Sequence, residues 1–198
     1  MTTTLTNGTN PFEGGLSVAR PTADEIVRIH QLGAAKISAD IASLDTFHQI
    51  HRHNSDSLWG VYAGDGALVG FFAFLMLTSD GVERLISGDL NTRAPTIDAL
   101  AKTGEAPNAI YIWALVAEKK TANALPLILG AFDAAVYART DLYARPATEG
   151  GLRLMAKVGF KPLGEGEIEP GELCVFRRSI VPTRIQYPGR SETAHAFV

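Results

Sequence analysis

The hydrophobic positions of this chain fall into continuous runs, which predict strands, and into helical repeats separated by polar turns. Two runs, LWGVY and ALVGFFAFLML, meet at a Gly-Asp-Gly turn and predict a β-hairpin over 58–77. The run AIYIWALV at 109–116 is rich in β-branched and aromatic residues, as expected of a central strand covered on both faces. Shorter strands are predicted at 16–21 and 140–144, and KPLGEG and LCVFRRSI predict two more near the end.

Four segments show the spacing of apolar positions that is typical of helices. They are 22–37, 39–53, 125–139 and the stretch from Gly150 that stops at Gly159. The first begins with Thr22 as N-cap, and Glu25 three places later completes a capping box. The inward positions expected for the first two helices are Ile26, Ile29, Leu32 or Gly33, then Ile41, Leu44, Phe47 and Ile50 or His51.

Residues 79–107 are less regular, and only Thr96 to Lys102 suggests a helix there. A connection of this length within a compact domain is more often functional than idle. The element order is β-α-α-β-β-insert-β-α-β-α-β-β, which predicts one α/β (α+β) domain with a mixed sheet and helices on its faces. We place this domain at 16–180, between a flexible N-terminal arm (1–15) and a C-terminal tail (181–198).

Composition narrows the classes of partner. The chain has 198 residues, a net charge of −3 and a pI near 5.9, so no overall basic field favours nucleic acid or an anionic membrane. The start of the chain lacks the features of a secretory signal, and the single cysteine, Cys174, excludes an internal disulfide framework. We therefore expect a cytoplasmic protein that binds neither nucleic acid nor membrane, and the sequence leaves a homodimer open.

One motif carries a resemblance to a known family. Residues 151–160 read GLRLMAKVGF, and four of them match in register a segment that ends Ala-x-x-Leu-Tyr-x-Lys-x-Gly-Phe in the GNAT superfamily of acetyl-CoA-dependent N-acyltransferases. The matching residues are Leu154, Lys157, Gly159 and Phe160. Gly159 is suited to end a helix because its left-handed conformation carries no Cβ penalty, and Phe160 then enters the core. The chain resembles this superfamily over roughly residues 16–180.

The resemblance implies acetyl-CoA as cosubstrate and a small-molecule or peptide amine as acceptor. In the family the fourth and fifth strands splay apart, and the pantetheine arm pairs with strand backbone in the gap, here near Leu115 and Val116. The pyrophosphate then lies on the loop and helix N-terminus that follow, where free N–H groups favour an anion. The corresponding loop residues here are Lys119, Lys120, Thr121, Ala122, Asn123 and Ala124. Alanine replaces a family glycine in this loop, and the lysines, Thr121 and Asn123 are the compensating phosphate contacts.

The candidate catalytic residues differ from those that are usual in the family. Met155 stands where many family members have a tyrosine that protonates the departing thiolate, so water or Tyr143 on the preceding strand would supply that proton. Strand 109–116 also lacks the acidic residue that the family often has there. His51 is a candidate general base, because the resemblance puts the first two helices beside the acceptor pocket and histidine titrates near neutrality. Tyr111 and Trp113 are expected on one side of the strand and Ile112 and Ala114 on the other.

Two other groups have simpler interpretations. His48, His51 and His53 would need a further ligand to form a metal site, and charges favourable to the end of a helix explain them better. Cys174 lies in an apolar strand and is expected to be a buried, inert thiol. We therefore predict no metal site, and an acyl-CoA-dependent N-acyltransferase whose acceptor is bordered by the 79–107 insert. The alternative is a GNAT-like protein without catalysis that binds a ligand or partner. A toxin-like acyltransferase acting on charged tRNA has no support from the acidic composition.

Overall fold

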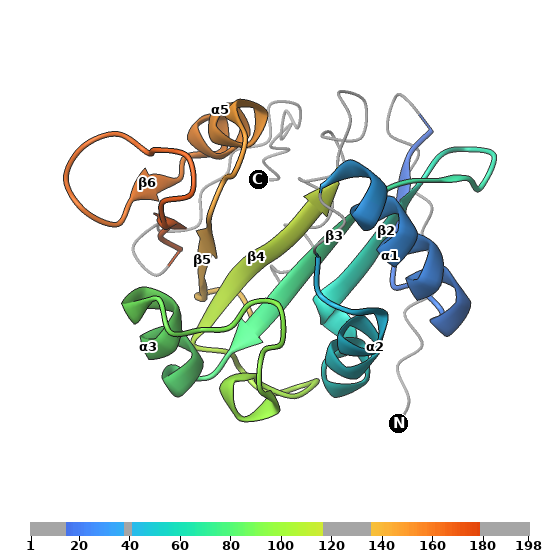
Figure 1. The fold of residues 1–198 in the computed structure, drawn as a ribbon, viewed down its shortest axis with the longest axis horizontal. Helices are drawn as coiled ribbons and strands as arrows, with labels where there is room; N and C mark the ends of the chain where they lie inside the picture. Colours follow the sequence, from blue (N-terminus) through green and yellow to red (C-terminus); the bar gives the residue numbers. More distant parts are fainter. Residues whose placement is uncertain (1–14, 38–40, 117–135, 179–198) are drawn as a thin grey trace, which may run out of the picture.

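The computed structural model describes residues 15–37, 41–116 and 136–178. Its centre is a seven-stranded sheet with the strand order β1-β2-β3-β4-β5-β7-β6. Only β4 and β5 run parallel, and every other neighbouring pair is antiparallel. The strands are Ser17–Ala19 (β1), Leu58–Tyr62 (β2), Leu68–Leu77 (β3), Ala109–Val116 (β4), Asp141–Ala144 (β5), Lys161–Pro162 (β6) and Cys174–Phe176 (β7) (Figure 1).

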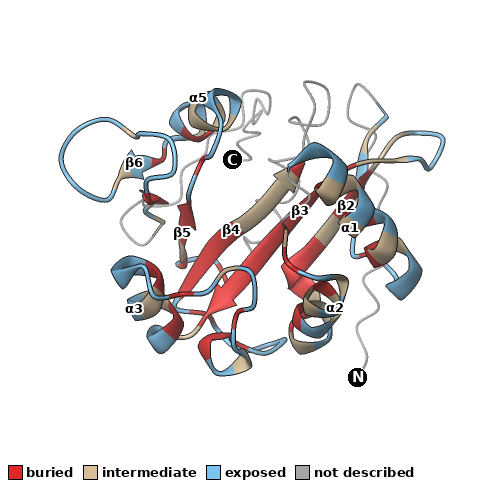
Figure 2. Ribbon diagram, viewed as in Figure 1, coloured by how far each residue is buried: buried red, intermediate tan, exposed pale blue. Residues whose placement is uncertain are grey.

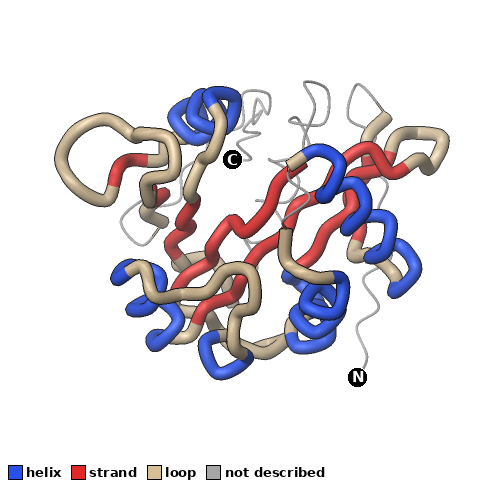
Figure 3. Tube along the Cα trace, viewed as in Figure 1, coloured by secondary structure: helices blue, strands red, loops and turns tan. Residues whose placement is uncertain are grey.

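Helices flank this sheet, as Figure 3 shows. They are Ala23–Lys36 (α1), Leu44–His53 (α2), Ser79–Ser87 (α3) and Glu149–Val158 (α5), with single 3-10 turns at Ser55–Ser57 and Ile97–Ala99. None of the helices in the described ranges is long and apolar enough to cross a membrane. The predicted helix over 125–139 lies outside the described residues except for its end, where 136–139 form a turn.

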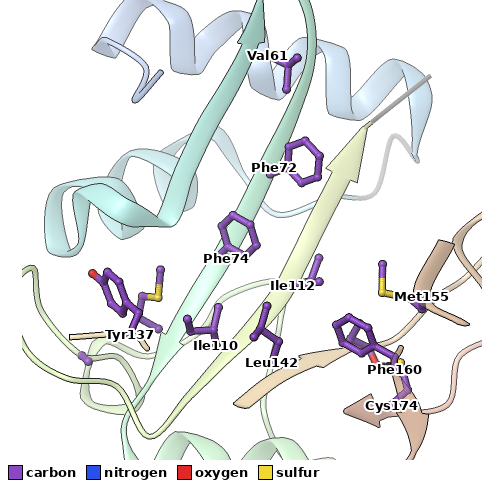
Figure 4. Close-up of a cluster of buried hydrophobic side chains, with 13 residues drawn as sticks. Val61, Phe72, Phe74, Ile110, Ile112, Tyr137, Leu142, Met155, Phe160 and Cys174 are labelled. Atoms are coloured by element: carbon purple, nitrogen blue, oxygen red, sulfur yellow. Dashed lines mark hydrogen bonds between the residues drawn. The ribbon is translucent and has the colours of Figure 1, made fainter. Parts of the chain in front are cut away.

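The strands of the sheet are largely buried (Figure 2), and hydrophobic side chains form a core on each of its two faces. On the α1–α3 face, Ile29 and Phe47 pack against Phe71 and Ala73 of β3, and Leu85 of α3 packs near Tyr111 and Tyr143. On the α5 face, the buried cluster comprises Phe72, Phe74, Met76, Ile110, Ile112, Leu142, Ala144, Met155, Phe160 and Cys174 with Val61, Ala101 and Tyr137 (Figure 4). Successive residues of β3 thus point alternately into the two cores, which is why this strand reads as one apolar run.

The mixed sheet, the hairpin and the first helix confirm the sequence predictions. The Thr22 backbone N–H donates to Oε2 of Glu25 at 2.8 Å, while the Glu25 N–H donates to Oγ1 of Thr22 at 3.4 Å, which completes the capping box. The Gly-Asp-Gly turn closes with Gly66 at φ 82°, a conformation that glycine adopts without strain.

Three predictions about local structure are wrong. Helix α2 begins at Leu44 and not at residue 39, because Ser43 is in an extended conformation and its Oγ caps the N–H of Thr46 at 3.1 Å. Residues 79–87 form helix α3, which Thr78 caps, whereas the predicted helix at 96–102 is reduced to the short turn Ile97–Ala99. The third error is the expected side of Ala114, which a β-bulge reverses.

The bulge lies in β4 at Trp113. Ala73 of β3 pairs with Ala114 and Phe74 pairs with Ile112, so Trp113 is the extra residue. Because the extra residue shifts the alternation, Trp113 and Ala114 both pack on the α1–α3 face, while Leu115 packs on the α5 face. A bulge bends a strand and increases its twist. Pairing between β4 and β5 ends one residue earlier, at Ile112 and Ala144, and the two strands then diverge (Figure 1).

Gly159 ends α5 as the sequence predicts. Its φ is 102°, and its N–H bonds the carbonyls of Met155 and Ala156. Phe160 follows at 3% exposure and packs against Phe176, with 5.7 Å between the ring centroids. The abrupt turn therefore fixes α5 against the sheet and performs no chemistry.

We predict that Gly159→Ala lowers the free energy of unfolding by about 1–2 kcal/mol, because a Cβ disfavours the left-handed conformation. The added Cβ would also lie 3.4 Å from the Phe176 ring. Urea denaturation measures this loss. Gly164→Ala is the matched control, since its added Cβ meets nothing within 4 Å and its φ is not positive. Equal losses in the two variants would contradict this account of Gly159.

Candidate functional site

The C-terminal half of β4 is the unusual part of the sheet. Residues Ala109–Ile112 are buried, whereas Trp113, Ala114 and Leu115 are each partly exposed. A central strand of a sheet with helices on both faces is normally buried throughout. Here Trp113 and Ala114 are accessible on the α1–α3 face and Leu115 on the α5 face, beyond the last pair that β4 makes with β5. The divergence therefore opens apolar strand surface on both sides of the sheet.

Met155 lies on the α5 face beside this divergence. It is 4% exposed and belongs to the same buried cluster as Ile112 and Ala144, the last paired residues of the two strands. Figure 4 shows Met155 to the right of Ile112 among the side chains of this cluster. The α5 position that carries a tyrosine in many GNAT sequences is thus held next to the point where β4 and β5 separate. A thioether has no proton to give.

Trp113 contacts several elements on the opposite, α1–α3, face. Its ring packs on Phe47 of α2, with 4.7 Å between the centroids, and its indole N–H donates to the carbonyl of Thr92 at 2.6 Å. Asn91 holds that part of the chain in a tight turn, because its Oδ1 accepts the N–H groups of Arg93 and Ala94. Trp113 therefore joins three elements: the bulge, α2 and the segment that follows α3.

Tyr143 lies on β5, one residue before the pairing with β4 ends. It is buried on the α1–α3 face among Tyr111, Leu85 and Val175. Its hydroxyl interacts with Arg177: the pKa of Arg177 is raised chiefly by its hydrogen bond to Asp141, and Tyr143 contributes in the same direction. This contact directs the phenol toward the beginning of β5.

His51 lies near the end of α2, and its imidazole is half-buried. The pKa of His51 is lowered, chiefly by burial and further by the positive charges of His48 and Arg20. The carboxylate of Asp56 acts in the opposite direction. Its Nδ1 is buried without a hydrogen-bond partner among the described residues. No hydrogen bond or ion pair in this part of the chain joins His51 to Tyr143, so the structure places the two predicted catalytic residues in separate surroundings.

A buried polar network near His51 is not evident from the sequence. Asp56 forms an ion pair with Arg20 and accepts a 2.6 Å hydrogen bond from the hydroxyl of Tyr137, which is distant in sequence. Asn54 completes the network by accepting the N–H of Asp56 and donating to the carbonyl of Ala101. The polar stretch HNSDS before β2 is the only signal, and it resembles any solvated turn. The network ties the start of β2 to the segment that leads into β5.

The remaining candidates from the sequence are the predicted pyrophosphate loop, a metal site and Cys174. The predicted pyrophosphate loop, Lys119 to Ala124, lies outside the described residues. Among the residues that are described, no three His, Cys, Asp or Glu side chains come together as a metal site would require. Cys174 is buried, and its thiol donates to the carbonyl of Ala144 at 3.3 Å. Burial raises the pKa of this thiol to about 11, so it stays protonated and unreactive at neutral pH.

Comparison with known proteins supports a fold, not a sequence family. No model of a known protein family and no curated protein matches this sequence. Among solved structures, an acetyltransferase of the GNAT family from Staphylococcus aureus aligns with a TM-score of 0.52 at 9% identity. The alignment covers 82% of this chain and 98% of that one. This chain has the GNAT fold.

Two further GNAT-fold structures give the same result. Diaminobutyrate acetyltransferase EctA from Paenibacillus lautus, in complex with diaminobutyric acid and coenzyme A, aligns with a TM-score of 0.55 at 13% identity, covering 86% of this chain and 99% of that one. The dodecameric spermidine N-acetyltransferase from Vibrio cholerae has a TM-score of 0.50 at 13% identity, with 83% and 95% covered. At these identities the likeness shows the fold alone.

Proposed function

We propose that this protein is an acyl-CoA-dependent N-acyltransferase that moves an acetyl or other short acyl group to an amine. One observation carries the proposal: past Ile112, β4 continues without β5 and leaves apolar residues partly exposed in the middle of the sheet. An extended chain such as a pantetheine arm can add to such an unpaired strand through backbone hydrogen bonds. The acetyltransferase names of the structural neighbours, one of them with coenzyme A bound, support the same reading.

The residues near the divergence fit a thioester substrate. Leu115 and Val116 offer strand backbone, and the N–H groups there would polarise the carbonyl oxygen as the amine attacks it directly. Much of the rate would come from holding amine and thioester together, with no covalent enzyme intermediate. The C–N bond forms as the C–S bond breaks, and the sulfur leaves as a thiolate that takes up a proton.

The proton transfers set the roles of two residues. His51 is our candidate base, because its lowered pKa keeps the imidazole neutral, and so able to accept a proton, at pH 7. Met155 lies beside the divergence and has no proton to donate, so the thiolate takes its proton from water, or from Tyr143, which would have to reach it from the α1–α3 face. A thiol of ordinary acidity, with a pKa of about 8.5, is an adequate leaving group with such help.

The alternative function is ligand binding without catalysis. The presence of Met155 in place of an acid favours it, since the group beside the divergence has no proton to donate. In this alternative the protein binds a ligand or a partner protein, and a bound acyl-CoA is not turned over.

We predict that acetyl-CoA raises the thermal midpoint of the protein, because a ligand that binds only the folded state stabilises it. Replacing Lys119 and Lys120 together by glutamate should weaken this binding roughly tenfold to a hundredfold, since each lysine is proposed to hold a phosphate by a charge-assisted hydrogen bond. Isothermal titration calorimetry measures the loss. Lys102→Glu with Lys161→Glu is the control, because it makes the same charge change at two exposed positions elsewhere. Equal affinity in the two double variants would remove the 119–124 loop from the site.

We predict that Met155→Tyr accelerates acyl transfer or thioester hydrolysis relative to Met155→Phe. The two variants add the same ring beside the divergence, and only tyrosine adds a proton donor, which is worth about 10²–10⁴-fold in general acid catalysis. Release of the CoA thiol measures the rate, with an amine panel that includes spermidine and 2,4-diaminobutyrate. Tyr143→Phe in the wild-type background should lower the rate if that phenol is the acid.

One combination of results would contradict catalysis. Should acetyl-CoA bind to the wild type and to all three variants while none releases thiol with any amine, the non-catalytic function would replace the transferase.

A further inference from the structure

The bulge residue Trp113 occupies a position that the coenzyme site does not use. It lies on the α1–α3 face, whereas Leu115 and Met155 lie on the α5 face. Past Ile112 the β4 residues are partly exposed on both faces, so we infer that an acceptor approaches the thioester from the α1–α3 face. Trp113 and Ala114 are the partly exposed β4 residues on that face.

The surroundings of Trp113 hold it rigidly. Its ring is fixed on one side by Phe47, which is 1% exposed and itself makes an edge contact with the ring of His30 at 5.5 Å. On another side the short bond from the indole N–H to the Thr92 carbonyl fixes its orientation. A partly exposed tryptophan in a single orientation provides a large apolar wall at low entropic cost.

One positively charged group, Arg145, lies on the same face, hydrogen-bonded to Leu85 of the cluster that Trp113 packs against. Burial raises the pKa of Tyr111, two residues before Trp113 on the same face, and the charged group that opposes this shift is the Arg145 guanidinium. Arg145 follows β5 directly, and its hydrogen bonds go to the carbonyls of Leu85 and Gly171. Neutral carbonyls do not cancel its charge, so a second positive group on an acceptor is disfavoured at this face.

We propose that Trp113 is a specificity-determining residue, whose ring contacts the carbon skeleton of the acceptor and selects a primary amine on an apolar, preferably aromatic, body with no second positive charge. This inference rests on the proposed transferase function. It assigns the acceptor to the α1–α3 face of the divergence and makes the segment around Thr92 part of the acceptor wall.

Phenethylamine and spermidine are the probes that separate this acceptor class from a polyamine. We expect a higher kcat/KM with phenethylamine, which places a ring on the indole and carries one amine. Trp113→Ala should lower that kcat/KM roughly 10- to 100-fold, the usual cost of truncating a central aromatic contact. Trp113→Phe should recover most of it, because the ring contact remains although the bond to Thr92 is lost. The dissociation constant of acetyl-CoA should stay within about twofold in both variants, because only strand backbone is proposed to contact the coenzyme and the Trp113 side chain lies on the face opposite Leu115.

Trp59→Phe is the matched control. The chain has two tryptophans, and the indole of Trp59 also donates to a backbone carbonyl, that of Asp56 at 2.9 Å, but it packs against the core on the α5 face. Its loss should lower thermal stability about as much as Trp113→Phe and leave the phenethylamine KM unchanged. In this variant Trp113 is the sole tryptophan, so its fluorescence reports amine binding directly, even without turnover.

The outcomes separate a failure of this inference from a failure of the transferase function. A change in Trp113 fluorescence with phenethylamine and not with spermidine supports the inference even if no thiol is released, in which case the transferase function fails alone. A preference for spermidine overturns the inference. An unchanged phenethylamine KM in a folded Trp113→Phe or Trp113→Ala variant also overturns it. In either case, turnover of acetyl-CoA leaves the transferase function standing. An absence of any fluorescence change in Trp59→Phe also overturns it.

Discussion

One extra residue in β4 determines how this sheet is arranged. The β3–β4 pairing is continuous from end to end except at Trp113, where one residue has no partner. The strand bends there, and its pairing with β5 stops at Ile112. β5 ends at Ala144, so beyond Ile112 the bent strand has no partner on that side and Leu115 stays partly exposed. The central strand can leave β5 without unfolding because β3 continues to pair with it up to Val116.

The same residue shift divides the site between two faces. Leu115 and Met155 face the side of the sheet that α5 covers, and Trp113 and Ala114 face the side that α1, α2 and α3 cover. In the proposed reaction the nitrogen of an amine must reach the carbonyl carbon of a thioester at the open strand. The divergence supplies that arrangement, since each face of the open strand is lined by different residues. The Asp56–Tyr137 bond stabilises it further, because it ties the segment entering β5 to the start of β2 on the other side of β4.

The sequence predicts those parts of the fold that local chemistry determines. Thr22 with Glu25, and Gly159 with Phe160, have one favourable local structure each, and both were predicted. The β-bulge was not, because AIYIWALV contains no glycine or polar residue to mark a break, and the bulge arises from pairing with β3. Helix α2 was predicted too long because Ser43 is a better cap than its position in the apolar repeat suggests. Of the site, the family resemblance led to Leu115 and to the substitution at Met155, whereas the Asp56 network depends on contacts between distant residues that no local pattern indicates.

Hydrogen–deuterium exchange of β4 tests the central claim most directly, because exchange reports which backbone amides are hydrogen-bonded and protected. The account predicts that in the free protein 113–116 exchange faster than 109–112, since one edge of that segment lacks a strand partner. It also predicts that saturating acetyl-CoA slows exchange in 113–116 and leaves 109–112 unchanged. Equal protection of the two halves in the free protein, or bound acetyl-CoA with no change at 113–116, would contradict the claim that the divergence of β4 and β5 is the binding site.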